Sequence, residues 1–444
     1  MELSGIKSFN GGIHPAYNKD LTSGSETVLM PAPERLVVPV GQHIGAPANP
    51  VVKKGDIVKL GQMIAEPGGF VSSPVHSPVS GKVISVQPEE HPMGSRIMAI
   101  TIENDGEDTM VEHQTISEPL EKDPDELKEI VKNSGIVGMG GATFPSHVKL
   151  SPPADKPIDF IILNGAECEP YLTADHRLML ENPESIVSGL EIISHITGVK
   201  KLYIGIEINK PDAIKKITKA LGKKGTVVPL AVKYPQGAEK QLIKAVTGRE
   251  VPPKHLPMEV GAIVFNVATA HAINKAVTEG IPLFERIVTV TGHGVQKPGN
   301  FLVRTGTMVS EVVDFSGGYT DDAAQLILGG PMMGKSSATD GVPVIKGTGG
   351  ILVLPSAEML TDAWGPCIRC GMCLRACPNQ QNPQLLGNLI EKGLFDKITE
   401  DKLEEIVLDD CFECGSCTFV CPANRPIVQF FHMAKAYFRA QKRK

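Results

Sequence analysis

Two cysteine runs near the C-terminus have the residue types and spacing that bind iron–sulfur clusters. Both read C-x2-C-x2-C-x3-C-P, and their cysteines are Cys367, Cys370, Cys373 and Cys377 in the first run and Cys411, Cys414, Cys417 and Cys421 in the second. Three closely spaced thiolates can hold one face of a cubane. The sequence therefore predicts two [4Fe–4S] clusters and a chain that moves single electrons.

The fourth ligand of each cluster is predicted to come from the other run. The doubled spacing resembles that of bacterial two-cluster ferredoxins, in which the last cysteine of each run crosses over. This resemblance implies one cluster on Cys367, Cys370, Cys373 and Cys421, and another on Cys411, Cys414, Cys417 and Cys377. Zinc and disulfides are the alternatives. Zinc sites usually combine two CxxC pairs or include histidine, and no histidine lies between Cys367 and Cys421.

Composition is that of an ordinary soluble protein of several domains. The chain has 444 residues, of which 41% are hydrophobic and 21% charged, and a net charge of −6. Eight of its nine cysteines lie in the two runs, and cluster thiolates need a reducing compartment. We expect a cytoplasmic location, no signal peptide, no membrane span, no nucleic-acid binding, and membrane association through partners only. Cys168 is expected to be a buried or pocket-wall thiol and not a ligand.

A glycine-rich loop is the second feature that could do chemistry. It reads Gly138-Met139-Gly140-Gly141-Ala142-Thr143-Phe144-Pro145, and Lys149 follows. Such a loop lets backbone amides approach a phosphate closely, with a lysine as an additional donor. A plain glycine-rich turn is the alternative. The loop is not the usual dinucleotide fingerprint, because the segment before it is a poor strand.

Pattern and composition divide the chain into five parts. Residues 1–29 form an arm whose segment 9–15 contains a two-glycine turn and His14, which we interpret as structural. Residues 30–112 read as short strands, including 82–86, and resemble the barrel-sandwich hybrid fold of biotinyl and lipoyl domains. The equivalent hairpin, residues 73–78, has no lysine, so we expect no covalent cofactor there.

The remaining three parts carry the chemistry. Residues 113–280 alternate strands (159–164 and 202–206) with helices (183–193, and one that starts near Asp123), which predicts a parallel α/β sheet. Residues 281–355, with strands at 286–292 and 299–303, resemble the soluble-ligand-binding (SLBB) β-grasp domain. Residues 356–444 form a ferredoxin-like domain with helical patterns at about 383–408 and 426–441. The fold class is thus multidomain α/β.

The middle part resembles the NADH-binding flavoprotein subunit of respiratory complex I. The resemblance rests on the glycine loop and on residues 164–170, 237–239 and 266–269. It implies that Gly138, Gly140, Gly141 and Lys149 surround the FMN phosphate and ribityl chain, and that Asn164 and Glu167 meet its ring or ribityl groups. Nucleotide contacts are implied for Phe144 and Glu169, a position close to both flavin and nucleotide for Glu239, and contacts at the phosphate end for Asn266 and Thr269. Ala238, Ala268 and the segment 251–254 depart from the family pattern, which weakens the case for NADH.

The order of all parts resembles the RnfC family, the C subunits of Rnf (Rsx) electron transport complexes. That family implies a peripheral, cytoplasmic-side subunit of an ion-translocating ferredoxin:NAD+ oxidoreductase. The subunit would exchange electrons between NAD(H), FMN and two [4Fe–4S] clusters. The implied partners are the ferredoxin-like B subunit and the membrane subunits. No catalytic acid or base is predicted. Two alternatives remain: a soluble flavin reductase resembling microcompartment cobalamin reductase, in which the barrel-sandwich segment lies at the other end, and a non-catalytic cluster scaffold.

Overall fold

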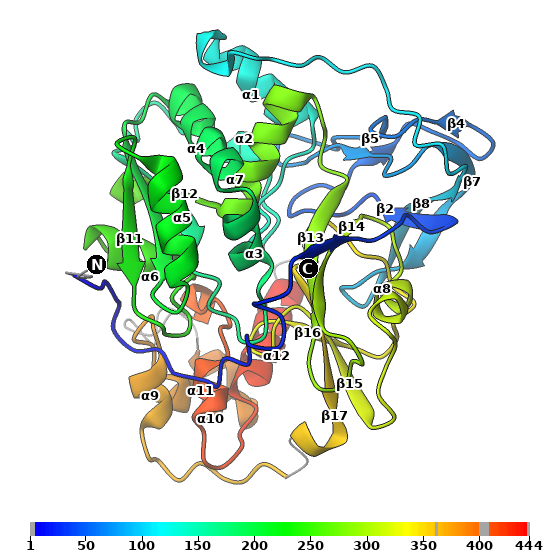
Figure 1. Cartoon of the computed structure of the whole chain (residues 1–444). Helices are drawn as coiled ribbons and strands as arrows, with labels where there is room; N and C mark the ends of the chain where they lie inside the picture. Colours follow the sequence, from blue (N-terminus) through cyan, green and yellow to red (C-terminus); the bar gives the residue numbers. More distant parts are fainter. Residues whose placement is uncertain (1–4, 360–362, 399–407, 442–444) are drawn as a thin grey trace.

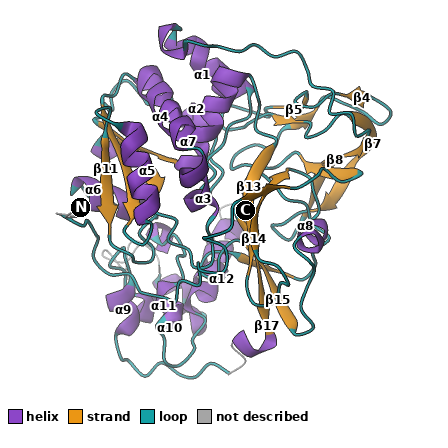
Figure 2. Cartoon of the chain, in the orientation of Figure 1, coloured by secondary structure: helices purple, strands orange, loops and turns teal. Residues whose placement is uncertain are grey.

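The computed structural model describes residues 5–359, 363–398 and 408–441 of the chain (Figure 1). A helix-rich half stands beside a strand-rich half, and the short helices α9 (Met372–Ala376), α10 (Pro383–Glu391) and α11 (Ser416–Phe419) of the cluster domain lie below the helix-rich half in this view (Figure 2). Among the described residues, no helix is long and apolar enough to cross a membrane.

The middle domain is built on a four-stranded parallel sheet in the order β11-β10-β9-β12. Its strands are β9 (Phe160–Gly165), β10 (Lys201–Glu207), β11 (Thr226–Leu230) and β12 (Ala262–Asn266). Its helices are α1 (Pro124–Asn133), α2 (Ser146–Lys149), α3 (Ala174–Glu181), α4 (Pro183–Thr197), α5 (Pro211–Leu221), α6 (Glu239–Thr247) and α7 (Val267–Asn274). The predicted strands and helices of this part, and the parallel sheet, are confirmed.

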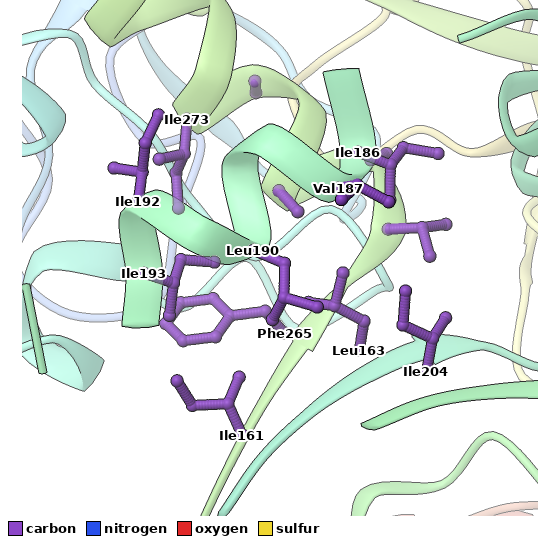
Figure 3. Packing of buried hydrophobic residues seen from close by; sticks show 14 of the residues in the cluster. Ile161, Leu163, Ile186, Val187, Leu190, Ile192, Ile193, Ile204, Phe265 and Ile273 are labelled. Carbon is purple, nitrogen blue, oxygen red and sulfur yellow. The ribbon is translucent and has the colours of Figure 1, made fainter. Parts of the chain in front are cut away.

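Both faces of this sheet are buried, as the apolar strand patterns require. Ile161 and Leu163 of β9 pack against α4 and α7 together with Phe265 (Figure 3), while Phe160 and Ile162 face α6. Burying each such side chain contributes about 1.5–3 kcal/mol. Gly189 lets α4 touch α7, since a Cβ there would lie 1.9 Å from the carbonyl oxygen of Ala270. This core fixes the carboxyl edge of the sheet.

The barrel-sandwich domain consists of two small antiparallel sheets. One has the order β2-β8-β7-β4, with β2 (Arg35–Pro39), β4 (Ile57–Val58), β7 (Gly81–Glu90) and β8 (Arg96–Asn104); the other is β3-β5-β6, with β3 (Asn49–Pro50), β5 (Met63–Glu66) and β6 (Val75–His76). The lysine-free hairpin is buried against its neighbours. Lys346 of the β-grasp domain donates hydrogen bonds from Nζ to the carbonyls of Pro74 (2.9 Å) and Gly135 (2.7 Å). The hairpin therefore lies at a three-domain junction.

The β-grasp domain has a six-stranded sheet in the order β1-β14-β13-β17-β15-β16. Its own elements are β13 (Glu285–Thr291), β14 (Gly299–Arg304), α8 (Val309–Phe315), β15 (Ala323–Leu328), β16 (Lys335–Ser337) and β17 (Gly350–Pro355). The edge strand β1 (Thr27–Leu29) comes from the N-terminal arm and pairs in parallel with β14. The end of the arm therefore forms the edge strand of this sheet.

The cluster domain is formed by short helices around the two cysteine runs. They are α9 (Met372–Ala376), α10 (Pro383–Glu391), α11 (Ser416–Phe419) and α12 (Ile427–Gln441). The prediction of helix at 426–441 is confirmed. The pattern at 383–408 extended too far, because α10 ends at Glu391 and Gly393 follows at a φ of +67°. The rest of that pattern, 399–407, lies outside the described residues.

Candidate electron-transfer site

The glycine loop presents an exposed row of backbone amides. The loop is closed at its base, where the Gly138 amide donates to the Phe144 carbonyl (2.8 Å) and the Met139 amide to Thr269 Oγ1 (2.9 Å). Among the described residues, none accepts a hydrogen bond from the amides of residues 140–143. Gly141 has a φ of +128°, and a Cβ on it would meet open space. Unpaired amides beside open space fit an anionic group such as the FMN phosphate.

Two asparagines lie at the carboxyl ends of β9 and β12. Asn164 and Asn266 are paired in register, at the point where the strand order reverses, which is where α/β sheets bind ligands. The Asn266 side chain accepts from the Ala268 amide (2.8 Å) to cap α7 and donates to Asp175 (2.6 Å). Asn164 Nδ2 donates to the Gly237 carbonyl (2.8 Å). The structure thus brings the glycine loop, β9 and β12 to one edge.

Lys149 and Glu239 form an ion pair at the same edge. Lys149 Nζ lies 2.9 Å from Glu239 Oε1 and 3.0 Å from the Val264 carbonyl oxygen. Both side chains are partly exposed, and an ion pair of this kind contributes about 0–1 kcal/mol. Because so little holds the pair together, Lys149 can turn toward a phosphate at small cost.

Glu167 and Glu169 are held by the protein itself. The Glu167 carboxylate accepts from the amides of Asp175 (2.6 Å) and His176 (3.2 Å). The Glu169 carboxylate accepts from the amides of Met332 (3.1 Å) and Met333 (2.9 Å) in the β-grasp domain. Burial raises the pKa of each carboxyl to about 7. Glu169 therefore joins two domains in this structure, and its contact with a nucleotide stays a prediction.

Three cations near Glu167, Glu169 and Asp175 were not found from the sequence; Lys210 and Arg286 are buried and Lys19 is half-buried. Lys19 donates from Nζ to the carbonyls of Glu169 and Leu172, and burial lowers its pKa to about 8. Lys210, 1% exposed, pairs with Glu207 (3.1 Å). Arg286 is buried near Asp175. These three residues come from distant segments of the sequence, so no motif or regular spacing along the chain could identify them. Phe144, whose predicted role is stacking, is half-buried and has no ring partner among the described residues.

The cysteines are arranged around two centres. A void in the first centre is lined by Cys367, Cys370, Cys373 and Cys421. In the second, burial raises the pKa of Cys417, and the thiols of Cys411, Cys414 and Cys377 raise it further, ahead of Cys373 of the first centre. Burial likewise raises the pKa of Cys411, and Cys414 and Cys377 raise it further, so these four thiols are near one another. This arrangement fits the predicted crossover. No three His, Cys, Asp or Glu side chains in the described ranges are gathered for one metal ion; a cubane spreads its ligands over a wider space.

The second centre lies against the middle domain. The buried Tyr234, which precedes α6, donates from its hydroxyl to the Cys414 carbonyl (2.7 Å). Cys168, near the carboxyl end of β9, packs in the same small cluster, and its Sγ accepts from the Gly237 amide at 3.2 Å. Cys168 is thus a packed thiol in this structure, as expected. His14 contacts the Val232 carbonyl oxygen at 3.1 Å.

Comparison with known proteins assigns each part of the chain to a domain family. The matches are the RnfC barrel sandwich hybrid domain (residues 7–107), the Nuo51 FMN-binding domain (131–275), the SLBB domain (287–336) and a 4Fe-4S dicluster domain (363–425). The predicted multidomain fold class is confirmed by these matches.

Three relatives are similar over nearly the whole chain. The C subunit of the proton-translocating ferredoxin:NAD(+) oxidoreductase complex of Clostridium ljungdahlii is 48% identical, covering 98% of this chain and 95% of the relative. That of the Na(+)-translocating complex of Acetobacterium woodii is 45% identical, covering 98% of each. That of the ion-translocating oxidoreductase complex of Rhodobacter capsulatus is 45% identical, covering 96% and 82%. The chain belongs to the RnfC family, the C subunits of Rnf-type ion-translocating ferredoxin:NAD+ oxidoreductase complexes.

Proposed function

We propose that this chain is the peripheral subunit through which an Rnf-type complex exchanges electrons with NAD(H), on the cytoplasmic side of the membrane. Its partners would be the other subunits of that complex, including a ferredoxin-like B subunit. One observation supports the proposal most directly: the second cysteine run packs, through Tyr234 and Cys168, against the same middle domain that carries the amide-lined loop. The family relationship supports it throughout its length.

The residues present fit FMN at the carboxyl edge of the sheet. The unpaired amides of residues 140–143 and Lys149 would hold its phosphate, and Gly138, Gly140 and Gly141 leave room for close approach. Asn164 and Glu167 would meet the ring or the ribityl chain, and Asn266 and Thr269 would lie at the phosphate end. When bound, a flavin accepts a hydride and releases its electrons one at a time. Phe144, Glu169 and Glu239 are the proposed nucleotide contacts.

The protein's own residues then have three tasks. The glycine loop, fixed at its base by Thr269, holds an anion without using side chains that could titrate. Lys149 supplies a positive charge that is only loosely committed to Glu239. The carboxylates and cations behind the edge keep its backbone rigid, since each of their charges is hydrogen-bonded. Cys367, Cys370, Cys373 and Cys421, and Cys411, Cys414, Cys417 and Cys377, would hold the two clusters.

Anaerobic reconstitution followed by metal and flavin analysis tests this function. The purified chain should contain about eight irons, as two cubanes require, and one FMN. Adding NADH should bleach the flavin and then the cluster absorbance, whereas a preparation reconstituted without FMN should not respond. An iron-loaded chain that takes up no flavin, or a bound flavin that NADH fails to bleach, would contradict the proposal.

A further inference from the structure

We infer that the N-terminal arm positions the second cluster against the flavin domain. We call the residues involved the clasp: Phe9, Gly11, Gly12 and Ile13 of the arm, with Tyr234. The inference rests on the proposed function, because it names the residues that set the separation between two redox groups. In Figure 1 the arm, in dark blue, runs between the green middle domain and the orange cluster domain.

The arm is hydrogen-bonded to both domains over two consecutive residues. Ile13 and Tyr234 exchange backbone hydrogen bonds, at 2.8 Å from the Ile13 amide and 2.9 Å from the Tyr234 amide. The Gly12 amide donates to the carbonyl of Ala376 (2.9 Å), directly before the cluster ligand Cys377. One short stretch of backbone therefore ties the flavin domain to a cluster loop.

The two glycines of the clasp leave no room for a side chain. A Cβ on Gly11 would lie 2.6 Å from the Cys377 carbonyl oxygen, and one on Gly12 would lie 2.6 Å from the Tyr234 carbonyl oxygen. Their φ angles are +76° and +78°, a region that favours glycine. The turn predicted from this motif is present. Its two glycines let the arm backbone approach the cluster domain at Cys377 and the middle domain at Tyr234.

Tyr234 joins the clasp to the second cysteine run. Its side chain is 1% exposed, and its hydroxyl donates to the Cys414 carbonyl. Ile13, Tyr234, Ala376 and Cys414 form one buried apolar cluster, with Cys168 and Met332 packed against it. Beside it, Lys233 donates to the Phe9 carbonyl (2.8 Å) and lies over the Phe9 ring at 4.5 Å. The clasp thus contacts ligands of the second cluster, Cys377 and Cys414, from two sides.

The consequence is a specific role for residues that touch neither NADH nor iron. Electron transfer between two bound groups weakens steeply with their separation, so a shift of the second loop would slow this step alone. Sites of this kind need support that holds geometry to within about 0.5 Å. The clasp residues are therefore positioning residues.

The test compares Gly12→Ala with Gly5→Ala in the full chain, reconstituted anaerobically. Gly5 also lies in the arm with a positive φ, +96°, but a Cβ there has no neighbour within 4 Å, so it controls for backbone strain. Two quantities are measured: hydrogen exchange of amides in 411–421, and the rates of flavin and cluster reduction after NADH mixing. Gly12→Ala should exchange faster in that segment and reduce the clusters several-fold more slowly, with unchanged flavin bleaching. Gly5→Ala should match the wild type.

Tyr234→Phe keeps the test decisive if Gly12→Ala fails to fold. It retains the ring and removes the hydrogen bond to Cys414, so it should alter the electron paramagnetic resonance (EPR) signal of the second cluster and leave that of the first unchanged. Wild-type exchange and wild-type cluster reduction in Gly12→Ala, or unchanged spectra in Tyr234→Phe, would overturn the inference. Failure of NADH to bleach the wild-type flavin would instead contradict the proposed function, and the exchange measurement does not depend on it.

Discussion

The two cysteine runs share a pattern of backbone angles but have different surroundings. Positive φ angles recur at equivalent places, at Arg369 and Glu413 and again at Gly371 and Gly415. Yet Cys370 is exposed whereas its equivalent, Cys414, is buried. A Cβ on Gly371 would meet only the tip of Arg375 at 3.6 Å, while one on Gly415 would lie 2.9 Å from the Met332 carbonyl oxygen. One ligand motif therefore yields an outer centre and an inner centre.

This difference suggests a direction for electron flow through the domain. The inner centre, with Cys411, Cys414, Cys417 and Cys377, lies against Tyr234 and the flavin domain. The outer centre, with Cys367, Cys370, Cys373 and Cys421, has exposed apolar neighbours, including Ile368 at 64% exposure. Cluster potentials respond to solvent exposure and hydrogen bonding. We therefore expect the inner cluster to lie next to the flavin and the outer cluster to lie farther along the path, nearer the solvent.

Removing one ligand from each centre should give the largest contrast. In Cys370→Ala, which damages the outer cluster, NADH should still reduce the inner cluster at a rate near that of the wild type. In Cys414→Ala, which damages the inner cluster, NADH should still bleach the flavin but leave the outer cluster oxidised. EPR spectra after NADH addition measure both. Equal reduction of the remaining cluster in the two variants would contradict the claim that electrons reach the outer cluster through the inner one.

If the inner cluster receives electrons from the flavin, FMN must bind at the glycine loop of the adjoining middle domain. Gly140→Val should lose nearly all bound FMN, because even a Cβ at this position would lie 3.3 Å from Asn266 and the added methyl groups would enter the space beside the exposed amides. Gly24→Val is the matched control, since a Cβ on Gly24 has no neighbour within 4 Å. Flavin released by acid and quantified by absorbance is the measurement. Wild-type flavin content in Gly140→Val would place the binding site elsewhere.

Sequence alone predicted much of the fold because its signals were local. Apolar runs predicted β9 and β10, and the cysteine spacing predicted both centres. The difference between those centres could not be predicted, because it depends on contacts between Tyr234 and Cys414, 180 residues apart. The cations Lys19, Lys210 and Arg286 were missed for the same reason. The roles of the arm's glycines appeared only when both neighbouring domains were placed.

Acid should weaken the molecule at the three-domain junction around His76 and Lys346. Burial lowers the pKa of His76 from 6.5 to about 3, with Lys346 as a second cause. Because the unfolded chain binds a proton that the folded chain excludes, stability falls as the pH drops below about 6.5. The loss from this group is about 2 kcal/mol at pH 5 relative to pH 8. His76→Gln should remove that component, as measured by denaturant unfolding at both values. An unchanged pH dependence in His76→Gln would show that this junction does not control acid sensitivity.

The smallest expected effect comes from the different solvent exposure of Cys370 and Cys414. It is a difference in the rates at which the two clusters decay in air. Oxidants and chelators reach exposed sulfur more readily than buried sulfur, so the outer cluster should lose iron several-fold faster than the inner one. Limited air exposure followed by EPR of the reduced sample would show which signal disappears first. The spectra of Cys370→Ala and Cys414→Ala identify the signals. Loss of both at one rate would mean that burial of Cys414 gives its cluster no protection.

The order in which the two clusters are reduced tests the central claim most directly. Wild-type protein, loaded with FMN and iron, is mixed with NADH and frozen at successive times for EPR. We predict that the signal assigned to Cys411, Cys414, Cys417 and Cys377 appears first and that the signal assigned to Cys367, Cys370, Cys373 and Cys421 follows. Earlier appearance of the second of these signals would contradict the claim that the inner cluster receives electrons from the flavin.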